Sequence, residues 1–378
     1  KKAQAQRPAG MGFFCQAKVR SGNNHLMNRP TKERGILMKK QLFGFLVGVC
    51  FLSCGLFMAN EGRCETIELK FAHFMSPMHV QHRLSFEPFA KKVADLTEGK
   101  VKIKIHPGGA LGGPKQLPDL VQAGVTDIAF IIPSYTTGRF ERLSVVDLPF
   151  MAESAVQATK IIYDLDDPYF SKDFEDYKVL WFYTCGPGQL QSATKPIEAV
   201  DTLKGMKMRA PSAYMSKALK MLGATAVGMP ISELTISLQK GVIDGMLTPY
   251  SAVKDFRLFD LVKYVTQVNM YVSPMAVVMN KEKFASLPDY ARNAIDEASG
   301  KPWGLHAAKV YDDEDQETIN EIKKQGKIEI IQPSDAVMKN FKEELSKMKS
   351  DWVAEMSKKG FPAQEILEAA QASAERNQ

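Results

Sequence analysis

The sequence predicts an α/β protein made of two similar lobes, and three observations support this fold class. Residues 67–132 and 206–247 each alternate short apolar strands with amphipathic helices, an order typical of parallel sheets covered by helices. The two units also end alike, because QAGVTD at 122–127 matches QKGVID at 239–244. No low-complexity linker separates them. We therefore expect several crossing segments to join the lobes as a hinge.

The first unit predicts three strands and two helices. An alternating strand occupies 67–74, and a helix over about 80–97 carries an apolar face. A second strand at 101–105 leads into the glycine-rich loop 106–114 and a further helix. The run DIAFII at 127–132 is almost continuously apolar, so we expect a strand that is buried on both faces.

The second unit repeats this order as two consecutive βαβ steps. Strands are expected at 206–209, 225–227 and 244–247. Helices are expected at 213–222 and at about 232–240.

The segments outside these units are expected to join them. Residues 143–150 and 178–195 look like crossings, and 179–183 is a strand long enough to pass from one sheet to the other. A strand at 268–279 is expected to return. The rest of the chain is mostly helical, and we interpret its acidic run at 312–315 as a solvated helix face.

The N-terminal part has the features of an export signal. From Met38, two lysines precede an uncharged apolar run at 42–59, which is typical of a secretory signal peptide over 38–64. The alternatives are a transmembrane anchor, because the run approaches spanning length, and a lipid anchor at Cys54. We interpret residues 1–37 as a non-native upstream extension.

The predicted mature chain divides into three parts. Residues 65–190 are expected to form mainly lobe I, with crossing segments, and 191–285 mainly lobe II. Residues 286–378 are expected to be C-terminal helices that pack on both lobes.

The basic charge of the sequence belongs to the predicted leader. The chain has 49 Lys/Arg and 43 Asp/Glu, and removing the 11 basic and 2 acidic residues of 1–64 leaves 38 and 41, a net charge of −3. We therefore expect no nucleic-acid partner. Of five cysteines only Cys185 remains, so neither a disulfide framework nor a cysteine metal cluster is expected.

Other kinds of site lack the spacing that their chemistry needs. His73, His79, His82 and His106 have no supporting carboxylate pattern, so we expect loop or cleft-lining histidines rather than metal ligands. The glycine-rich loop 106–114 lacks the lysine-serine ending of a phosphate-binding loop. No nucleophile elbow is present in the sequence. We expect no catalytic residue, no metal and no cofactor.

Arg209 is the strongest candidate for a binding residue. It ends the strand 206–209, and open α/β sheets bind ligands at the carboxyl ends of their strands. A guanidinium matches a carboxylate bidentately, and the helix that starts after Pro211 adds free N–H groups that favour anions. The alternative is an arginine paired with a carboxylate of the fold. We expect Arg209 to bind a small anion.

Several motifs together resemble the solute-binding proteins of tripartite ATP-independent periplasmic (TRAP) transporters. They are FAKKVADLTEGKVKIKIHPGGALGG, LVQAGVTDIAF, VDLPF, KPIEAVDTLKGMKMRAP, LGATAVGMPISEL and LQKGVIDGMLTP, and the resemblance covers Ile67 to the C-terminus. It implies a type II-like, two-lobed periplasmic binding fold with hinge-crossing strands and a long C-terminal helical region. The family's carboxylate-clamping arginine falls on Arg209.

The sequence departs from the family pattern at positions that bear on the ligand. Gln189 stands where many members carry a second arginine, and MLTP at 246–249 replaces the common Gln-Glu-Asn-Pro. One fixed positive charge and an apolar wall favour an aromatic or apolar monocarboxylate, or a 2-oxo acid, over dicarboxylates and acidic sugars. The predicted ligand-binding residues are Arg209, Gln189, Ser212, Thr248, Tyr250, Phe74, His79, Tyr135 and Tyr183. Further candidates for the wall are Met75, Ser134 and Tyr271.

The resemblance also implies a function. The protein is expected to be a periplasmic monomer that closes on a small carboxylate and delivers it to the membrane subunits of a TRAP permease. Two other functions are compatible with the sequence. One is a secreted hydrolase or lyase that uses His73, His79 or Asp244, and the other is a ligand sensor for a membrane receptor.

Overall fold

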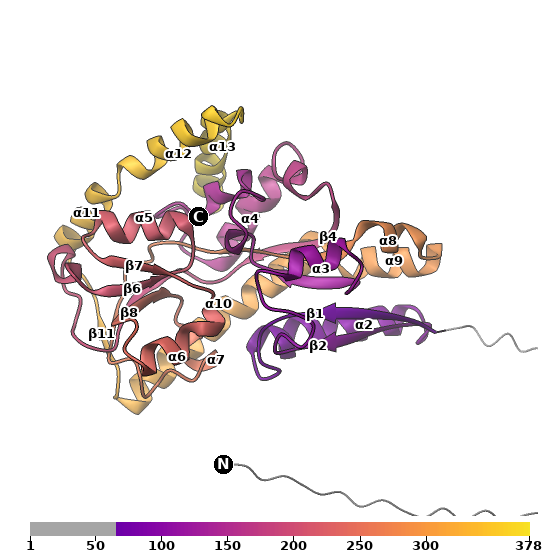
Figure 1. Ribbon diagram of the computed structural model, residues 1–378, viewed down its shortest axis with the longest axis horizontal. Helices are drawn as coiled ribbons and strands as arrows, with labels where there is room; N and C mark the ends of the chain where they lie inside the picture. The colour runs from indigo at the N-terminus through magenta and orange to yellow at the C-terminus, as the bar shows by residue number, and fades with distance from the viewer. Residues whose placement is uncertain (1–65) are drawn as a thin grey trace, which may run out of the picture. The chain divides into compact units, whose positions relative to one another are not determined.

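The computed structural model describes residues 66–378, and Figure 1 shows that two sheets organise them. The predicted extension at 1–37 and the predicted signal peptide at 38–64 lie outside the described residues. Within the described part, no helix combines the length and apolarity that crossing a bilayer requires. The predicted α/β class is confirmed.

The first sheet has the strand order β2-β1-β3-β10-β4. Strand β1 pairs in parallel with β2 and β3, whereas β10 is antiparallel to both β3 and β4. The elements of this lobe, in chain order, are β1 (Ile67–Ala72), the π-helical turn η1 (His82–Phe86), α2 (Glu87–Leu96), β2 (Val101–His106), α3 (Leu117–Gln122), β3 (Ile128–Ile131), the 3₁₀ turns η2 (Pro133–Tyr135) and η3 (Arg142–Asp147), α4 (Ala155–Leu165), η4 (Phe170–Phe174), β4 (Tyr177–Thr184) and the returning β10 (Pro274–Asn280). The expected return to the first sheet is confirmed, because β10 lies between β3 and β4, but the strand begins at Pro274 rather than at Val268.

The second sheet has the order β11-β9-β5-β8-β6-β7. Its strands are β5 (Gln189–Ser192), β6 (Lys207–Ala210), β7 (Thr225–Gly228), β8 (Gly245–Thr248), β9 (Tyr264–Thr266) and β11 (Glu329–Ile331). The helices and turns near it are η5 (Val200–Leu203), α5 (Ala213–Met221), η6 (Ile231–Glu233), α6 (Leu234–Gln239) and α7 (Ser251–Asp255). The predicted strands and helices of the second unit are confirmed, whereas β5, β9 and β11 were not predicted as separate strands.

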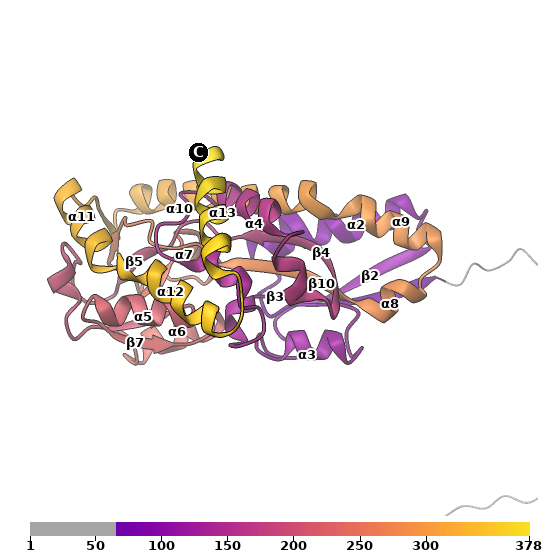
Figure 2. The same cartoon turned by 90° about the horizontal axis from the view of Figure 1, so that it is seen from above.

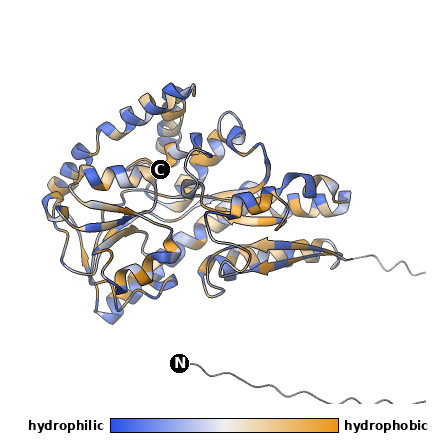
Figure 3. Ribbon diagram, in the orientation of Figure 1, coloured by the Kyte–Doolittle hydropathy of each residue, from blue (hydrophilic) through white to orange (hydrophobic). Residues whose placement is uncertain are grey.

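Alternation along the strands gives this second sheet two apolar faces. Met208 and Leu247 pack with Leu219 of α5 on one face. Met246 packs with Leu234 and Val253 on the other. Successive strand side chains point to opposite faces, so each face buries its own set. Figure 1 accordingly shows α5 on one side of the sheet and α6 with α7 on the other, and hydrophobic colour follows the strands in Figure 3.

Two chain crossings between the sheets lie side by side. The segment 185–188 leads from β4 to β5, and 268–273 leads back towards β10. The backbone N–H of Gly188 donates to Tyr271 O at 2.7 Å, and Met270 N–H donates to Gly188 O at 2.9 Å. A Cβ atom on Gly188 would come within 1.9 Å of the Tyr271 ring, so the close approach requires glycine. These paired segments form the hinge.

The long helix α10 (Gly300–Gln325) spans both lobes, because it packs on β4 and α4 and also on α7. The prediction that the acidic run 312–315 is a solvated face is wrong for Glu314 and Asp315. Both are buried where α10 meets the second lobe; Glu314 pairs with Lys254 at 3.0 Å, and Asp315 accepts the Ser251 N–H at 2.5 Å. Burial raises the pKa of Asp315 to about 7.

The remaining helices are α8 (Lys281–Ser286), α9 (Asp289–Ala298), α11 (Asp335–Glu344), α12 (Lys347–Lys358) and α13 (Ala363–Arg376). Figure 2 shows α11, α12 and α13 following one another along the molecule. Helix α11 contacts η5 of the second lobe, and α13 contacts α4 and η3 of the first. The domain boundaries at 190 and 285 stay a prediction, because the chain from Cys64 to Gln378 forms one compact unit.

Candidate functional site

A cavity of about 40 Å³ lies where the two lobes meet. The first lobe lines it with Phe74, Met75, His79, Phe130, Ile132 and Tyr135. The second lobe adds Arg209, Pro211, Ile231, Pro249, Ser251, Ala252, Asp255 and Phe256. Cys185, Tyr271, Ser273, Met275 and Tyr311 complete it from the hinge, β10 and α10. The wall is therefore mostly apolar, with a few polar groups.

Arg209 is the positive charge of this cavity and is 1 % exposed. Strand β6 holds it, and its guanidinium donates to Met229 O at 3.1 Å, Leu247 O at 3.2 Å and the Tyr135 hydroxyl at 3.2 Å. No acidic side chain of residues 66–378 lies within ion-pairing distance of it. The predicted alternative, an arginine paired inside the fold, therefore finds no partner in the described residues. A buried charge without a counter-ion is costly, so an anion would stabilise it.

The protein uses only some of the hydrogen-bond donors of Arg209 and Tyr135. A guanidinium has five N–H groups, and the three bonds above leave about two of them for a ligand. The Tyr135 oxygen accepts from Arg209 and from the Ile231 N–H, at 3.0 Å, which leaves its own O–H free to donate. Burial raises the pKa of Tyr135, so the hydroxyl stays protonated. Two N–H groups and one O–H can thus converge on one carboxylate.

Aromatic rings form much of the remaining wall. The Phe74 ring lies 5.4 Å from Phe130 and 6.4 Å from Tyr135, measured between centroids. Across the cavity, His79 lies edge-on to Phe256 at 5.7 Å and to Tyr311 at 6.1 Å. Such rings bury apolar area and can pack against a ligand ring by offset or edge-on contacts.

A second polar cluster joins the lobes at this cavity. Asp255, at the end of α7, accepts the Val80 N–H at 3.0 Å and lies 3.3 Å from His79 Nε2. Burial raises the pKa of Asp255 to about 7 and lowers the pKa of His79 to about 3. The imidazole is therefore neutral, and its contact with Asp255 is not an ion pair.

Of the predicted site residues, Arg209, Phe74, His79 and Tyr135 line this cavity, as do Met75 and Tyr271. Gln189 does not line it, so the structure lends no support to its predicted ligand contact. Its amide oxygen accepts the N–H groups of Val268 and Asn269, and its nitrogen donates to Pro187 O and Asn269 Oδ1. These four bonds use its capacity within the hinge.

Four further predicted residues also lie outside the cavity. Ser212 caps the N-terminus of α5 by accepting the Met215 N–H at 3.1 Å. Thr248 is buried within the ladder of β8, and Tyr250 donates to Gln267 at 3.4 Å. The Tyr183 ring stacks on the Tyr311 ring, with 6.2 Å between the ring centroids.

Several residues that line the cavity were not predicted from the sequence. The most important of them are Asp255, Phe256 and Tyr311. Asp255 lies on a five-residue helix that has no recognisable periodicity. Tyr311 precedes the acidic run of α10, where nothing in the local sequence indicates contact with the other lobe. Only the position of α10 across both lobes brings it to the cavity.

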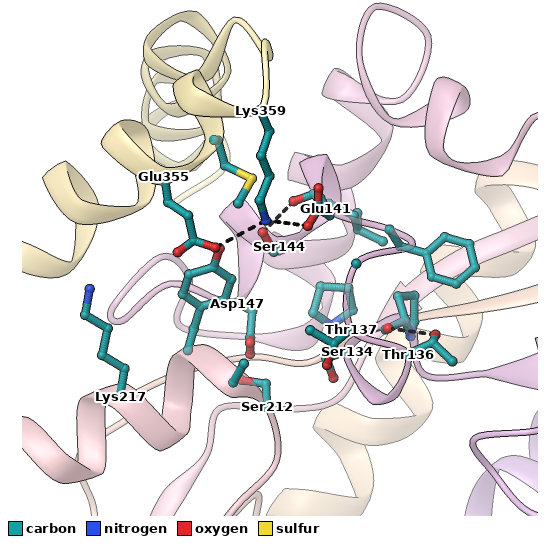
Figure 4. Close-up of a pocket in the computed structure, with 18 residues that line it drawn as sticks. Ser134, Thr136, Thr137, Glu141, Ser144, Asp147, Ser212, Lys217, Glu355 and Lys359 are labelled. Atoms are coloured by element: carbon teal, nitrogen blue, oxygen red, sulfur yellow. Dashed lines mark hydrogen bonds and ion pairs between the residues drawn. The ribbon is translucent and has the colours of Figure 1, made fainter.

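A larger cavity of about 160 Å³ lies beside η3, the start of α5 and the end of α12 (Figure 4). Ser134 and Ser212 line it rather than the Arg209 cavity. Its two lysines are already paired: Lys217 with Asp351 at 2.6 Å, and Lys359 with Glu141 and Glu355. It therefore offers no free cation for a carboxylate.

Asp147 is the buried acid of this larger cavity and faces Ser212 in Figure 4. Neither of its carboxyl oxygens has a hydrogen-bond partner within the described residues. Burial raises its pKa to about 8, an effect that the nearby Ser212 hydroxyl and Arg209 only partly offset. The carboxyl is therefore largely protonated at neutral pH.

The geometry of residues 66–378 supports neither a metal site at the histidines nor a reactive cysteine. His73 and His82 are hydrogen-bonded at 2.9 Å, and burial lowers the pKa of His73 to about 3. No group of three or more His, Cys, Asp or Glu side chains in residues 66–378 is arranged to hold a metal. Burial raises the pKa of the Cys185 thiol to about 12, which makes it a poor nucleophile.

Comparison with known families decides what kind of protein carries this cavity. Residues 71–355 match the model of the bacterial extracellular solute-binding proteins, family 7 (DctP). The chain belongs to this family. It is a TRAP-type solute-binding protein, and its two lobes are those of the TRAP periplasmic binding fold.

Solved structures of TRAP solute-binding proteins resemble this protein over most of its length. One, from an unidentified marine microbe, is specific for aromatic acids and holds metahydroxyphenylacetate; it is 31 % identical, with a TM-score of 0.80, and the match covers 82 % of this chain and 99 % of that one. Another, from Rhodoferax ferrireducens T118, holds copurified benzoate; it is 30 % identical, with a TM-score of 0.80, over 82 % and 98 % of the two chains.

A relative with a different ligand is the 2,3-diketo-L-gulonate-binding periplasmic protein YiaO of Escherichia coli K12. It is 25 % identical over 73 % of this chain and 84 % of its own length. Solute-binding proteins of the TRAP type bind small carboxylates, work with membrane permease components, and are transport proteins rather than enzymes. Relatives thus include proteins named for aromatic acids, a sugar acid and C4-dicarboxylates, so family membership alone does not fix the ligand class.

Proposed function

We propose that this solute-binding protein captures an aromatic or otherwise apolar monocarboxylate, or a 2-oxo acid, in the periplasm and delivers it to a TRAP permease. The observation that carries the proposal is the buried guanidinium of Arg209, which faces an apolar cavity and has no acidic partner among residues 66–378. A ligand carboxylate would supply that partner. We also expect the protein to act as a monomer.

The carboxylate end of the ligand would bind at Arg209 and Tyr135. The two unused guanidinium N–H groups suit a carboxylate in a bidentate arrangement, and the free Tyr135 O–H adds a third donor. Bonds between a buried guanidinium and a carboxylate are short and strong because both partners are charged.

Lobe closure would follow from contacts on both sides of the cavity. Tyr135 of the first lobe holds Arg209 and Ile231 of the second, and Asp255 of the second lobe holds Val80 of the first. A ligand that touches both lobes favours the closed form by the difference in its affinity for the two forms. Capture is thus a shift between open and closed populations.

The rest of the wall favours an apolar ligand body. Phe74, Phe130 and Phe256 line the cavity, and none of them can replace the hydrogen bonds that water makes to sugar hydroxyls. The aromatic acids held by two relatives that are at least 30 % identical support this ligand class. A polyhydroxylated sugar acid would leave several hydroxyls without partners.

The test is the Arg209→Ala variant, with benzoate titrated calorimetrically against the wild type. Truncating one partner of a desolvated charge pair costs about 2–5 kcal/mol, so we expect the Kd for benzoate to rise about 30-fold or more. Arg376→Ala is the matched control, because this arginine is exposed on α13 and pairs only with Asp164. An unchanged Kd in Arg209→Ala would refute the clamp.

Delivery to a permease needs a separate test. Genes for the small and large membrane subunits beside this gene would support transport, and uptake of labelled benzoate should then require both this protein and those subunits. Uptake that is unaffected by deleting this gene would argue for the sensor role instead.

A further inference from the structure

We propose that the His79–Asp255 pair recognises a hydroxyl group on the ligand, remote from its carboxylate, and rejects a second carboxylate at that place. This inference rests on the proposed function and deepens it, because it narrows the ligand to a hydroxy-substituted aromatic monocarboxylate. The pair and the Arg209 cluster line the same cavity. Arg209 donates hydrogen bonds to Tyr135, Met229 and Leu247, whereas Asp255 accepts from Val80 and lies beside His79, so the two clusters use different partners.

The hydrogen bonds of the pair fix which atoms carry protons. His79 Nδ1 accepts the Gln81 N–H at 3.2 Å, so Nε2 must carry the proton of the neutral imidazole. That Nε2–H lies 3.3 Å from Asp255 Oδ2, while Asp255 Oδ1 accepts the Val80 N–H. The side chain of Asp255 thus accepts a hydrogen bond from Val80 of the first lobe and lies beside the His79 ring.

This arrangement leaves Asp255 able to accept from a ligand. An ionised carboxylate offers about four lone-pair sites on its two oxygens, and the Val80 N–H uses one of them. A phenolic or alcoholic O–H on the ligand can donate to one that remains. Hydrogen bonds to a charged acceptor are about twice as strong as those between neutral groups, so this contact would favour a hydroxylated ligand.

The same carboxyl disfavours a dicarboxylate. Arg209 is the one Lys or Arg among the residues that line the cavity, and Asp255 is the one Asp or Glu. A second ligand carboxylate near Asp255 would meet a like charge and no cation among the lining residues, because Lys254 and Arg83, whose charges act on Asp255, do not line the cavity. The free-energy cost of burying that carboxylate therefore rises. A ligand with an unsubstituted ring, such as benzoate, neither donates a hydrogen bond to Asp255 nor places a like charge beside it.

The experiment measures Kd by calorimetry for benzoate, 3-hydroxybenzoate, 4-hydroxybenzoate and isophthalate at pH 8, above the Asp255 pKa of about 7. In the wild type we expect at least one hydroxybenzoate to bind about tenfold more tightly than benzoate, and isophthalate about tenfold more weakly. In Asp255→Asn we expect both ratios to fall within about threefold of one. Asp260→Asn, exposed and paired with Lys327, should leave the wild-type ratios unchanged.

The readout is the ratio of each Kd to the Kd for benzoate. A substitution that changes lobe closure alters all four Kd values together, so its effect cancels in these ratios. The inference is overturned if neither hydroxybenzoate binds more tightly than benzoate to the wild type, or if the advantage persists in Asp255→Asn. The wild-type ratios decide the first point even where the variant does not fold. Tight benzoate binding with no hydroxyl preference would leave the proposed function standing, whereas no binding of any of the four compounds would also overturn the aromatic ligand class within that function.

Discussion

The phenol oxygen of Tyr135 lies 3.2 Å from Arg209 Nη2 and 3.0 Å from the Ile231 nitrogen, so one side chain of the first lobe holds two donors of the second. Tyr135 lies on the turn that follows β3, and Arg209 lies near the end of β6. The residue that would clamp the ligand is therefore also a residue that joins the lobes. Ligand capture and closure share the same hydrogen bonds.

Replacing Tyr135 with Phe should weaken binding without removing the ring from the cavity wall. The variant loses the bond to Arg209, the bond to the Ile231 N–H and the free donor to the ligand. A hydrogen bond to a charged group contributes about 1.5–3 kcal/mol, so we expect the Kd for benzoate to rise about tenfold or more.

Calorimetry on Tyr290→Phe provides the control, because Tyr290 is an exposed tyrosine of α9. If Tyr135→Phe bound benzoate as tightly as Tyr290→Phe, this result would contradict the role assigned to Tyr135.

The hinge makes a different prediction, about stability. In Gly188→Ala the new Cβ would come within 1.9 Å of the Tyr271 ring, so the ring or the crossing segment must move. Forcing a methyl group into a filled site typically costs about 1–3 kcal/mol of unfolding free energy. Urea denaturation followed by circular dichroism measures this change.

Gly113→Ala is the matched control for the hinge variant. A Cβ at Gly113 would lie 3.6 Å from the Gln116 Oε1 atom, which is ordinary contact. Equal stability of the two alanine variants would show that the hinge tolerates the methyl group and that the close approach is not required.

The strand-end rule predicted Arg209 correctly as a cavity residue because it depends only on local order: strand, charged residue, helix. The same rule could not place Gln189. The residue lies at the start of β5, and whether its side chain faces the ligand or the hinge depends on the loop at Val268 and Asn269, nearly eighty residues later. Family position alone therefore did not indicate that the side chain is hydrogen-bonded within the hinge.

Long-range packing also explains the other differences. Asp255 reaches the cavity because α7 meets the loop at Val80, a pairing of residues far apart in the sequence. Glu314 and Asp315 are polar by composition but buried because α10 spans both lobes. Periodicity indicates which face of a helix is apolar, but it does not indicate that a second lobe covers the polar face.

Asp147 gives a prediction about pH. The ordinary pKa of this group is 3.8, and burial raises it to about 8 in the folded protein. Between these two values the folded protein holds a proton that the unfolded chain has released, so the contribution of Asp147 to stability falls as pH rises across that interval. Asn has the shape of the protonated carboxyl and does not ionise. We therefore expect Asp147→Asn to match the wild type in melting temperature near pH 4 and to exceed it at pH 9.

Asp255 and Asp315 have pKa values raised to about 7 and contribute the same trend, so the wild type should lose stability with rising pH even apart from Asp147. The difference between the wild type and Asp147→Asn isolates the one group. Asp313→Asn, exposed on α10 and paired with Lys309, should follow the wild type at both pH values. If Asp147→Asn instead melted below the wild type at pH 9, the carboxylate would be stabilised in the fold, and Asp147 would carry a charge beside Ser212 rather than a proton.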